Sequence, residues 1–232
     1  MTPRVLVAGS SGGIGSELAR QLRAAGYTVF TLSRSGTPSD FHCVADLSAA
    51  TSIPLVQSFL QQVKPDVVFC CAGLLHNETH GPEKTVTQLH ADWLLQSMQA
   101  NVLPHVHLAQ ALAPLLNRQR PVKWISLSAM VGSISDNHLG GWYSYRMSKA
   151  ALNMFIRNLA IEWGRKAPGS VVVAQHPGTT DTHLSQPFQA GIAEGKLYST
   201  ELTASRLIAV MQGLTAQQHG ALLHWDGSVI PF

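Results

Sequence analysis

The feature that most constrains this chain is a short apolar run, Val5 to Ala8, that ends in a cluster of glycines. The run predicts a strand, and the residues from Gly9 to Gly15 predict a tight turn that leads into a helix. Glycines let a ligand lie against bare backbone, and the first amides of a helix favour negative charge. Two interpretations are open: a turn without a ligand, or a turn that binds a dinucleotide pyrophosphate through Gly9, Ser11, Gly12, Gly13, Ile14 and Gly15.

Length and composition indicate one α/β domain that spans residues 1–232. The hydrophobic content of 45% can fill a sizeable core. Charged residues make up 12% of the chain, against about 25% in typical soluble domains. We therefore expect part of the surface to be covered by further copies of the chain, in a homodimer or homotetramer.

Charge and hydropathy exclude several classes of function. The formal net charge is only +3, and the basic residues form no run, so nucleic-acid binding is not expected. The sequence contains no apolar stretch of roughly 18 residues, so no membrane span is expected. The three cysteines have neither metal-ligand nor disulfide-framework spacing, which is typical of a reducing compartment. We predict a cytoplasmic protein without a metal.

Alternating strand and helix patterns predict a Rossmann-type, doubly wound parallel sheet of about seven strands with helices on both faces. After the first strand and a helix ending near Gly26, strands are predicted at residues 27–32, 41–45, 66–71, 122–128, 171–175 and 221–224. Further helices are predicted at about 51–63, 85–116, 143–163 and 199–214, the second of them bent at Pro104. An apolar tail, residues 229–232, is expected to be free and to add to a second subunit interface.

The ends of the early strands complete the predicted nucleotide site. Where a dinucleotide fold presents the adenosine ribose, the chain has Ser33-Arg34-Ser35 and no acidic residue. A guanidinium between two hydroxyls suits a 2′-phosphate, which favours NADP over NAD. The residues that close the next two strands belong to the same predicted site: Asp46, Leu47, Cys71, Ala72 and Gly73.

Four motifs together resemble the short-chain dehydrogenase/reductase family: Gly9-x-x-x-Gly13-Ile14-Gly15, Asn101, Tyr145-x-x-x-Lys149 and Pro177-Gly178-x-x-x-Thr182. The resemblance covers nearly the whole chain. Within the family, Pro82-Glu83-Lys84 and the segment from Gly140 to Lys149 resemble the C-factor and sniffer-like branch. Members of that branch are described as signalling proteins or as carbonyl reductases.

The resemblance implies roles for individual residues. Tyr145 would exchange a proton with the substrate oxygen, and Lys149, four residues along the same helix face, would lower its pKa and bind the nicotinamide ribose. Asn101 would anchor a water in a proton relay, and Pro177, Gly178, Thr179, Thr180 and Thr182 would contact the cofactor. Residues 74–85 and 178–198 would be substrate loops.

Two departures from the family pattern affect function. The Asn-Asn-Ala-Gly that usually closes the fourth strand is Cys70-Cys71-Ala72-Gly73, and Ala129 stands three residues before Gly132, at the usual position of the catalytic serine. Ser128 or Ser133 could replace that serine. The leading hypothesis is an NADP-dependent oxidoreductase for a small or apolar carbonyl or alcohol. The alternative is a catalytically weak or inactive dinucleotide-binding protein that signals or senses redox state.

Overall fold

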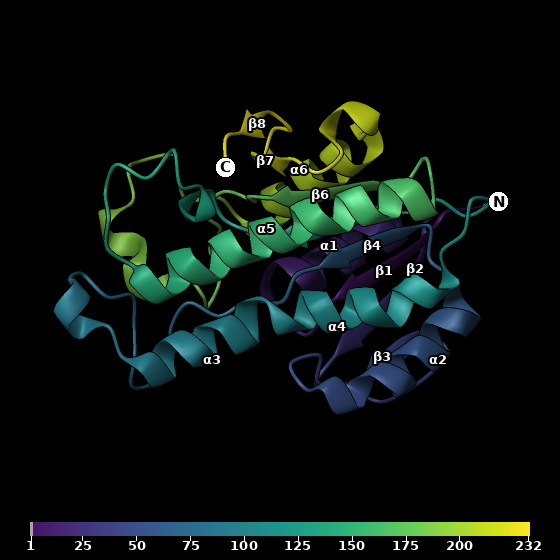
Figure 1. Ribbon diagram of the computed structural model, residues 1–232, viewed down its shortest axis with the longest axis horizontal. Helices are drawn as coiled ribbons and strands as arrows, with labels where there is room; N and C mark the ends of the chain where they lie inside the picture. Colours follow the sequence, from purple (N-terminus) through teal and green to yellow (C-terminus); the bar gives the residue numbers. More distant parts are fainter. Residues whose placement is uncertain (1) are drawn as a thin grey trace.

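A mostly parallel sheet runs through the centre of the protein, with helices on both faces (Figure 1). In this computed structural model, residues 2–232 are described, and their eight strands lie in the order β3-β2-β1-β4-β5-β6-β7-β8. The strands are β1 (Arg4–Ala8), β2 (Thr28–Ser33), β3 (His42–Val44), β4 (Val67–Cys70), β5 (Lys123–Leu127), β6 (Val171–Gln175), β7 (Leu222–Leu223) and β8 (Val229–Ile230). The predicted doubly wound α/β fold is confirmed.

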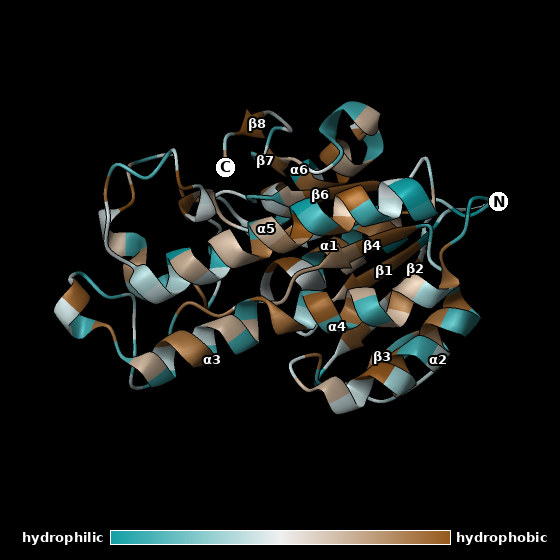
Figure 2. Ribbon diagram, in the orientation of Figure 1, coloured by the Kyte–Doolittle hydropathy of each residue, from teal (hydrophilic) through white to brown (hydrophobic). Residues whose placement is uncertain are grey.

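The described residues contain six α-helices. They are α1 (Gly13–Ala24), α2 (Ile53–Val63), α3 (Ala91–Asn101), α4 (Leu103–Leu112), α5 (Tyr143–Lys166) and α6 (Thr200–Gly213). Helices α2, α4 and α5 bury apolar residues against one face of the sheet, and α1 and α6 bury theirs against the other. Figure 2 shows the strands as the most hydrophobic part of the chain, as expected for a parallel sheet that is covered on both faces.

The order of the strands places the functional segments at one edge. Strand β1 pairs with β2 on one side and with β4 on the other, so the chain leaves β1 at the point where the strand order reverses. In open α/β sheets, ligands bind outside the carboxyl ends of the strands at such a point. The segments that follow β1, β4, β5 and β6 are therefore brought together there. In Figure 1 the N-terminal end of α5 lies at the left, on the same side as the loops before α3 and after β6.

The long helix expected over residues 85–116 is divided in the structure, so that part of the prediction is wrong. Residues 86–88 form a separate 3₁₀ turn, α3 ends at Asn101, and α4 starts at Leu103. Pro104 lies in the first turn of α4. Backbone N–H groups in a first turn have no intrahelical acceptor, so proline costs the helix no hydrogen bond there. The proline therefore starts a new helix beside Asn101 and does not simply bend one continuous helix.

The apolar tail is not free, which corrects the expectation for residues 229–232. Val229–Ile230 pairs antiparallel with β7 as an eighth strand, because the sheet edge offers unpaired backbone groups. Beyond it, the Pro231 carbonyl accepts a hydrogen bond from the Ser133 hydroxyl, and the Phe232 carbonyl accepts one from the Ser135 hydroxyl at 2.6 Å. The tail thus holds the loop that follows β5.

Residues 2–232 include no helix with both the length and the apolar character needed to cross a bilayer. The same residues contain no group of three or more histidine, cysteine or acidic side chains arranged to hold a metal ion.

Replacing Gly15 with alanine tests the packing of α1 on β1. A Cβ at Gly15 would lie 2.2 Å from the carbonyl oxygen of Gly9, so α1 would have to move away from the sheet. We expect Gly15→Ala to lower the free energy of unfolding by about 1–3 kcal/mol, the usual cost of overpacking. Urea denaturation followed by circular dichroism measures it. Gly12→Ala is the matched control, because a Cβ there meets nothing within 4 Å and φ is −171°. Equal losses in the two variants would contradict the account.

Candidate active site

The turn after β1 forms an open cradle at the start of α1. Gly9 and Gly13 have φ values of +79° and +51°, which residues with side chains rarely adopt. Ser11, Gly12 and Gly13 are exposed, so the backbone at the N-terminal end of α1 faces solvent. A Cβ at Gly9 would lie 3.0 Å from the backbone of Cys71 and Ala72, so this turn also lies against the end of β4. Bare backbone at a helix N-terminus fits the pyrophosphate of a dinucleotide.

The end of β2 presents one exposed cation. The Arg34 side chain is exposed, whereas Ser33 is buried and its hydroxyl donates to the carbonyl of Ser35 at 2.6 Å. Asp46 follows β3, and the pKa of its carboxyl is lowered mainly by hydrogen bonds from Ser48 and also by the charge of Arg34. Arg34 therefore provides a guanidinium at the place where the sequence predicts a ribose 2′-phosphate.

Asn101 and Lys149 converge beside Gly73, just beyond the end of β4. A Cβ at Gly73 would lie 3.4 Å from Asn101 Oδ1 and 3.5 Å from Lys149 Nζ. The Asn101 side chain is fully buried, donates to Leu74 O and Ser148 Oγ at 2.9 Å each, and accepts from Leu74 N at 2.6 Å. Gly73 itself is exposed, so the convergence point lies at the surface of the sheet edge. The absence of a side chain at Gly73 leaves room for a ribose beside both groups.

Tyr145 and Lys149 lie on one face of α5, one helical turn apart. Lys149 Nζ lies 5.7 Å from the centre of the Tyr145 ring and donates to Leu127 O at 3.0 Å. Burial lowers the pKa of Lys149 to about 8 and raises the pKa of the Tyr145 phenol above its usual value. Burial therefore shifts the pKa of the Tyr145 phenol in the direction opposite to the lowering that its spacing to Lys149 predicts.

Neither candidate for the missing serine has its hydroxyl directed to Tyr145. Ser128 is buried, and its hydroxyl donates to Asn153 Oδ1 beneath α5 at 2.6 Å. The Ser133 hydroxyl donates to the Pro231 carbonyl in the C-terminal tail. Ala129 is extended, with φ −148° and ψ 147°, and starts the 3₁₀ turn after β5. Alternation along the extended backbone directs Ser128 and Ala129 to opposite sides.

The turn after β6 contacts both the glycine cradle and α6. Thr182 lies over Gly13, where a Cβ would be 3.2 Å from the threonine methyl, so the turn after β6 reaches the glycine cradle at this residue. Thr180 is directed away from it, because its buried hydroxyl pairs with that of Thr203 on α6 at 2.8 Å. Gly178 has φ +81° and lies under the Tyr198 ring, 2.8 Å from a hypothetical Cβ.

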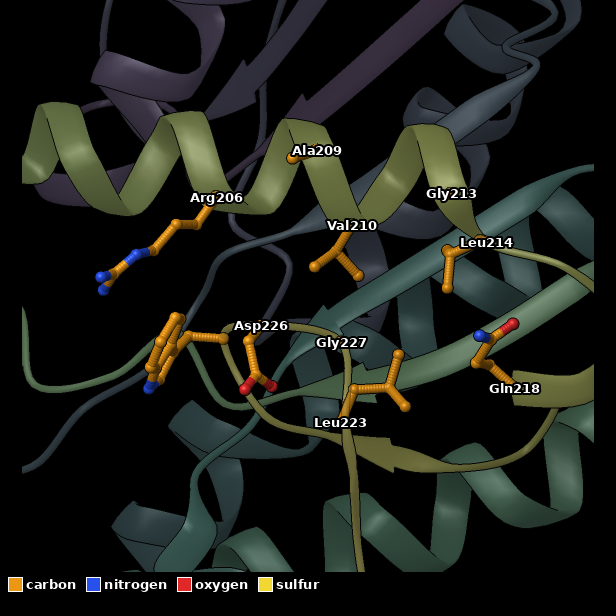
Figure 3. Close-up of a pocket in the computed structure, with 10 residues that line it drawn as sticks. Arg206, Ala209, Val210, Gly213, Leu214, Gln218, Leu223, Asp226 and Gly227 are labelled. Carbon is orange, nitrogen blue, oxygen red and sulfur yellow. The ribbon is translucent and has the colours of Figure 1, made fainter.

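A cavity of about 310 Å³ lies between α6 and the segment around β7 (Figure 3). Val210 and Leu223 point into it, and Arg206 stands at one end. The guanidinium carbon of Arg206 lies 3.9 Å from the centre of the indole ring of Trp225, which also lines the cavity. A Cβ at Gly178 would lie 3.5 Å from the Trp225 ring, so this end of the cavity adjoins the turn after β6. None of the predicted site residues lines this cavity, and the candidate active site is separate from it.

An arc of aromatic rings connects the two predicted substrate loops to the start of α5. Trp142 lies 6.2 Å from Tyr145 and 5.6 Å from Phe188, measured between ring centres. Phe188 in turn lies 5.7 Å from His76, and His76 lies 5.4 Å from His183. The loops before α3 and after β6 therefore meet above Tyr145.

Two residues without a predicted role, Glu83 and Arg146, fix the backbone around Tyr145. The Glu83 carboxylate accepts hydrogen bonds from the amide and the hydroxyl of Ser144. The Arg146 guanidinium donates to Gly141 O at 3.1 Å and to Val131 O at 3.3 Å. Glu83 and Arg146 both belong to the motifs that resemble the C-factor and sniffer-like branch. The sequence therefore marks these two residues but does not predict what they bind.

Comparison with known proteins shows the family of this chain. The family model described as short chain dehydrogenase matches residues 3–193. The chain belongs to the short-chain dehydrogenase family. A curated relative, the 1-hydroxy-2-glutathionyl-2-methyl-3-butene dehydrogenase of Rhodococcus sp. (strain AD45), is 30% identical over 236 residues, which cover 97% of this chain and 98% of the relative.

Two solved carbonyl reductases have the same fold as this chain. The carbonyl reductase Sniffer of D. melanogaster has a TM-score of 0.83 at 21% identity, with complete coverage of both chains. The NADPH-bound carbonyl reductase from chicken fatty liver has a TM-score of 0.82 at 21% identity, covering 100% of this chain and 94% of the other. The fold of the family is thus shared across nearly the full length.

Proposed function

We propose that this protein is an NADP-dependent oxidoreductase that reduces a carbonyl group carrying apolar or aromatic substituents. The observation that carries the proposal is the convergence of Asn101, at the end of α3, and Lys149, on α5, beside Gly73. Lys149 lies on the helix face that also carries Tyr145. The glycine cradle after β1 lies at the same sheet edge. The aromatic arc above Tyr145 favours apolar substituents on the substrate.

In this proposal Tyr145 donates a proton to the carbonyl oxygen. Its raised pKa keeps the phenol protonated before the reaction, and the ammonium of Lys149 stabilises the phenolate that forms. Bound NADPH supplies the hydride. The Asn101 amide holds the backbone of Leu74 and thereby keeps Gly73 open beside Lys149.

Ala129 leaves this mechanism without one hydrogen-bond donor. Removal of a donor to a developing oxyanion commonly costs about 10²–10³ in rate. Because the hydroxyls of Ser128 and Ser133 are engaged elsewhere, the proposal expects slow catalysis that depends mainly on Tyr145 and Lys149. Ala129 and the Cys70-Cys71 pair favour the alternative function, a catalytically weak or inactive dinucleotide-binding protein that signals or senses redox state.

Two substitutions separate these functions. We expect Tyr145→Phe to abolish carbonyl-dependent NADPH oxidation and to leave NADPH affinity nearly unchanged, because the phenolic proton matters only in the chemical step. Ala129→Ser should raise kcat by about tenfold or more, because it restores a donor. The measurements are NADPH absorbance with a carbonyl panel and fluorescence titration of NADPH. Turnover that survives Tyr145→Phe undiminished would defeat the mechanism, and a parent without turnover would favour the signalling alternative.

The preference for NADP rests on Arg34, whose guanidinium is exposed where an NAD-specific site would carry an acidic residue. The bound NADPH of the chicken carbonyl reductase supports the same choice for this chain. A cation at this position attracts the 2′-phosphate. The nearby Asp46 carboxylate accepts hydrogen bonds from the amide and the hydroxyl of Ser48.

Arg34→Ala tests the choice of cofactor. We expect the ratio of NADPH to NADH affinity to fall by roughly tenfold to a hundredfold, the usual range for loss of a charge-assisted contact. Fluorescence titration with each nucleotide measures the ratio. Arg118→Ala, at an exposed arginine far along the chain, is the control and should leave the ratio unchanged. An unchanged ratio in Arg34→Ala would show that this guanidinium does not recognise the phosphate.

We further propose that the protein forms a homodimer or homotetramer through α5. Three exposed apolar side chains follow that helix at intervals of seven residues: Met147 is 38% exposed, Met154 62% and Ile161 45%. This spacing places them on one helix face. A row of exposed apolar side chains on one face is typical of a contact between copies.

Sedimentation velocity tests this assembly. The parent should sediment as a dimer or tetramer at micromolar concentration, and Met154→Asp should shift it toward the monomer, because the interface would bury an unpaired charge. Leu55→Asp is the control, since Leu55 is 55% exposed on α2 and lies outside the proposed interface. A monomeric parent, or an unchanged assembly in Met154→Asp, would contradict the proposal.

A further inference from the structure

Glu83 is a buried acid in a loop whose other polar side chains are largely exposed. It is only 4% exposed, and no salt bridge to it is formed within residues 2–232. Its carboxylate accepts hydrogen bonds from the Ser144 amide at 3.1 Å and from the Ser144 hydroxyl. Ser144 is the second residue of α5 and directly precedes Tyr145. The acid therefore satisfies a helix N-terminus that lies 61 residues further along the chain.

The backbone of the same loop holds the turn that leads into α5. Trp142 N donates to Glu83 O, and a Cβ at Gly141 would lie 3.3 Å from that same carbonyl oxygen. Gly140, Gly141 and Trp142 all have positive φ, the last at +53°. A tryptophan in the left-handed region persists only where its surroundings determine the conformation. The hydrogen bond to Glu83 O is one such determinant.

Capping alone does not explain a buried acid at this place. A serine, threonine or aspartate at the residue before the helix usually supplies the cap, and such a residue is exposed and local in sequence. Burial of a carboxylate is unfavourable unless hydrogen bonds and the helix N-terminus compensate for the lost water. The hydrogen bonds that stabilise the buried Glu83 carboxylate come from Ser144, so they exist only while the loop lies against α5. The interaction therefore couples the position of the loop to the position of the helix.

We propose that Glu83 is a positioning residue, which ties the first substrate loop to the start of α5 and so sets the place of Tyr145 and of the Trp142 indole. This inference rests on the proposed carbonyl reductase function. The Trp142 ring contacts both Tyr145 and Phe188, so it is the wall between the reacting phenol and the second substrate loop. When the tie is lost, the wall and the phenol shift relative to a bound carbonyl, while the glycine cradle after β1 stays in place.

Glu83→Gln tests this role because it keeps the size of the side chain and leaves only one acceptor oxygen for the two donors of Ser144. At 25 °C, we expect kcat/KM for the carbonyl to fall by about tenfold to a hundredfold, since small misplacements of reacting groups have effects of this size. The NADPH dissociation constant should stay within about twofold of the parent value, because the cradle does not contact Glu83. Glu162→Gln is the control, an exposed acid on the same helix.

A double-mutant cycle with Ser144→Ala checks that the effect passes through the contact. If it does, Glu83→Gln should cost much less in kcat/KM on the Ser144→Ala background than on the parent background. Ser144→Ala alone removes only the hydroxyl that donates to Glu83. If Glu83→Gln does not fold, Ser144→Ala replaces it, and the same fall in kcat/KM with unchanged NADPH affinity is expected. Additive losses from the two substitutions would overturn the proposal. So would a Glu83→Gln protein with parental kcat/KM, or one that loses NADPH affinity as strongly as turnover.

Hydrogen–deuterium exchange gives a readout that needs no turnover. In Glu83→Gln we expect faster exchange over residues 142–145, with parental rates over residues 9–15. If the parent protein reduces no carbonyl, the proposed function has failed. The exchange rates alone then test whether Glu83 holds the first substrate loop against the start of α5. Faster exchange at residues 142–145 then supports it, and parental rates there overturn it.

Discussion

The close packing of the loop after β5 against α5 is the constraint on which the rest of the site depends. A Cβ at Gly132 would lie 2.8 Å from the backbone of Lys149, so only glycine lets the two segments meet. This contact holds α5 over the ends of the central strands, where Lys149 Nζ donates to the last carbonyl of β5. The ammonium is thereby fixed beside Gly73, and the phenol one turn earlier is fixed with it.

The same packing explains the positions of the two serines near Ala129. Ser128 lies beneath α5 and pairs with Asn153, while Ser133 holds the C-terminal tail beside the edge of the sheet. Both hydroxyls therefore stabilise the loop and the helix that frame Tyr145. The site thus combines a tyrosine and a buried lysine on one face of α5 with an alanine at residue 129.

Local sequence patterns predict most of the fold, because apolar strands and glycine turns are determined by residues close in sequence. The strand at residues 171–175 is confirmed as β6. The division of the helix between Asn101 and Leu103 and the pairing of the tail with β7 were not predicted. Both depend on tertiary contacts, which local periodicity does not report.

The candidate site likewise has parts that local sequence patterns predict and parts that depend on tertiary contacts. Tyr145, Lys149 and the glycine turn are predictable from spacing, since each pattern lies within about one helical turn or one loop. Glu83 is not, because its partner Ser144 is distant in sequence and the signal is a tertiary contact. The pKa of Tyr145 is likewise set by burial, which the four-residue spacing to Lys149 does not reveal.

The most direct test of the central claim, that Tyr145 and Lys149 serve hydride transfer to a carbonyl, follows the transferred hydrogen itself. The protein is incubated with NADPH deuterated at the transferred position and with an aryl ketone, and the alcohol is analysed by mass spectrometry. The account predicts one deuterium on the carbinol carbon with the parent protein and no labelled alcohol with Tyr145→Phe. Alcohol that forms without deuterium, or labelled alcohol in equal yield from both proteins, would contradict it.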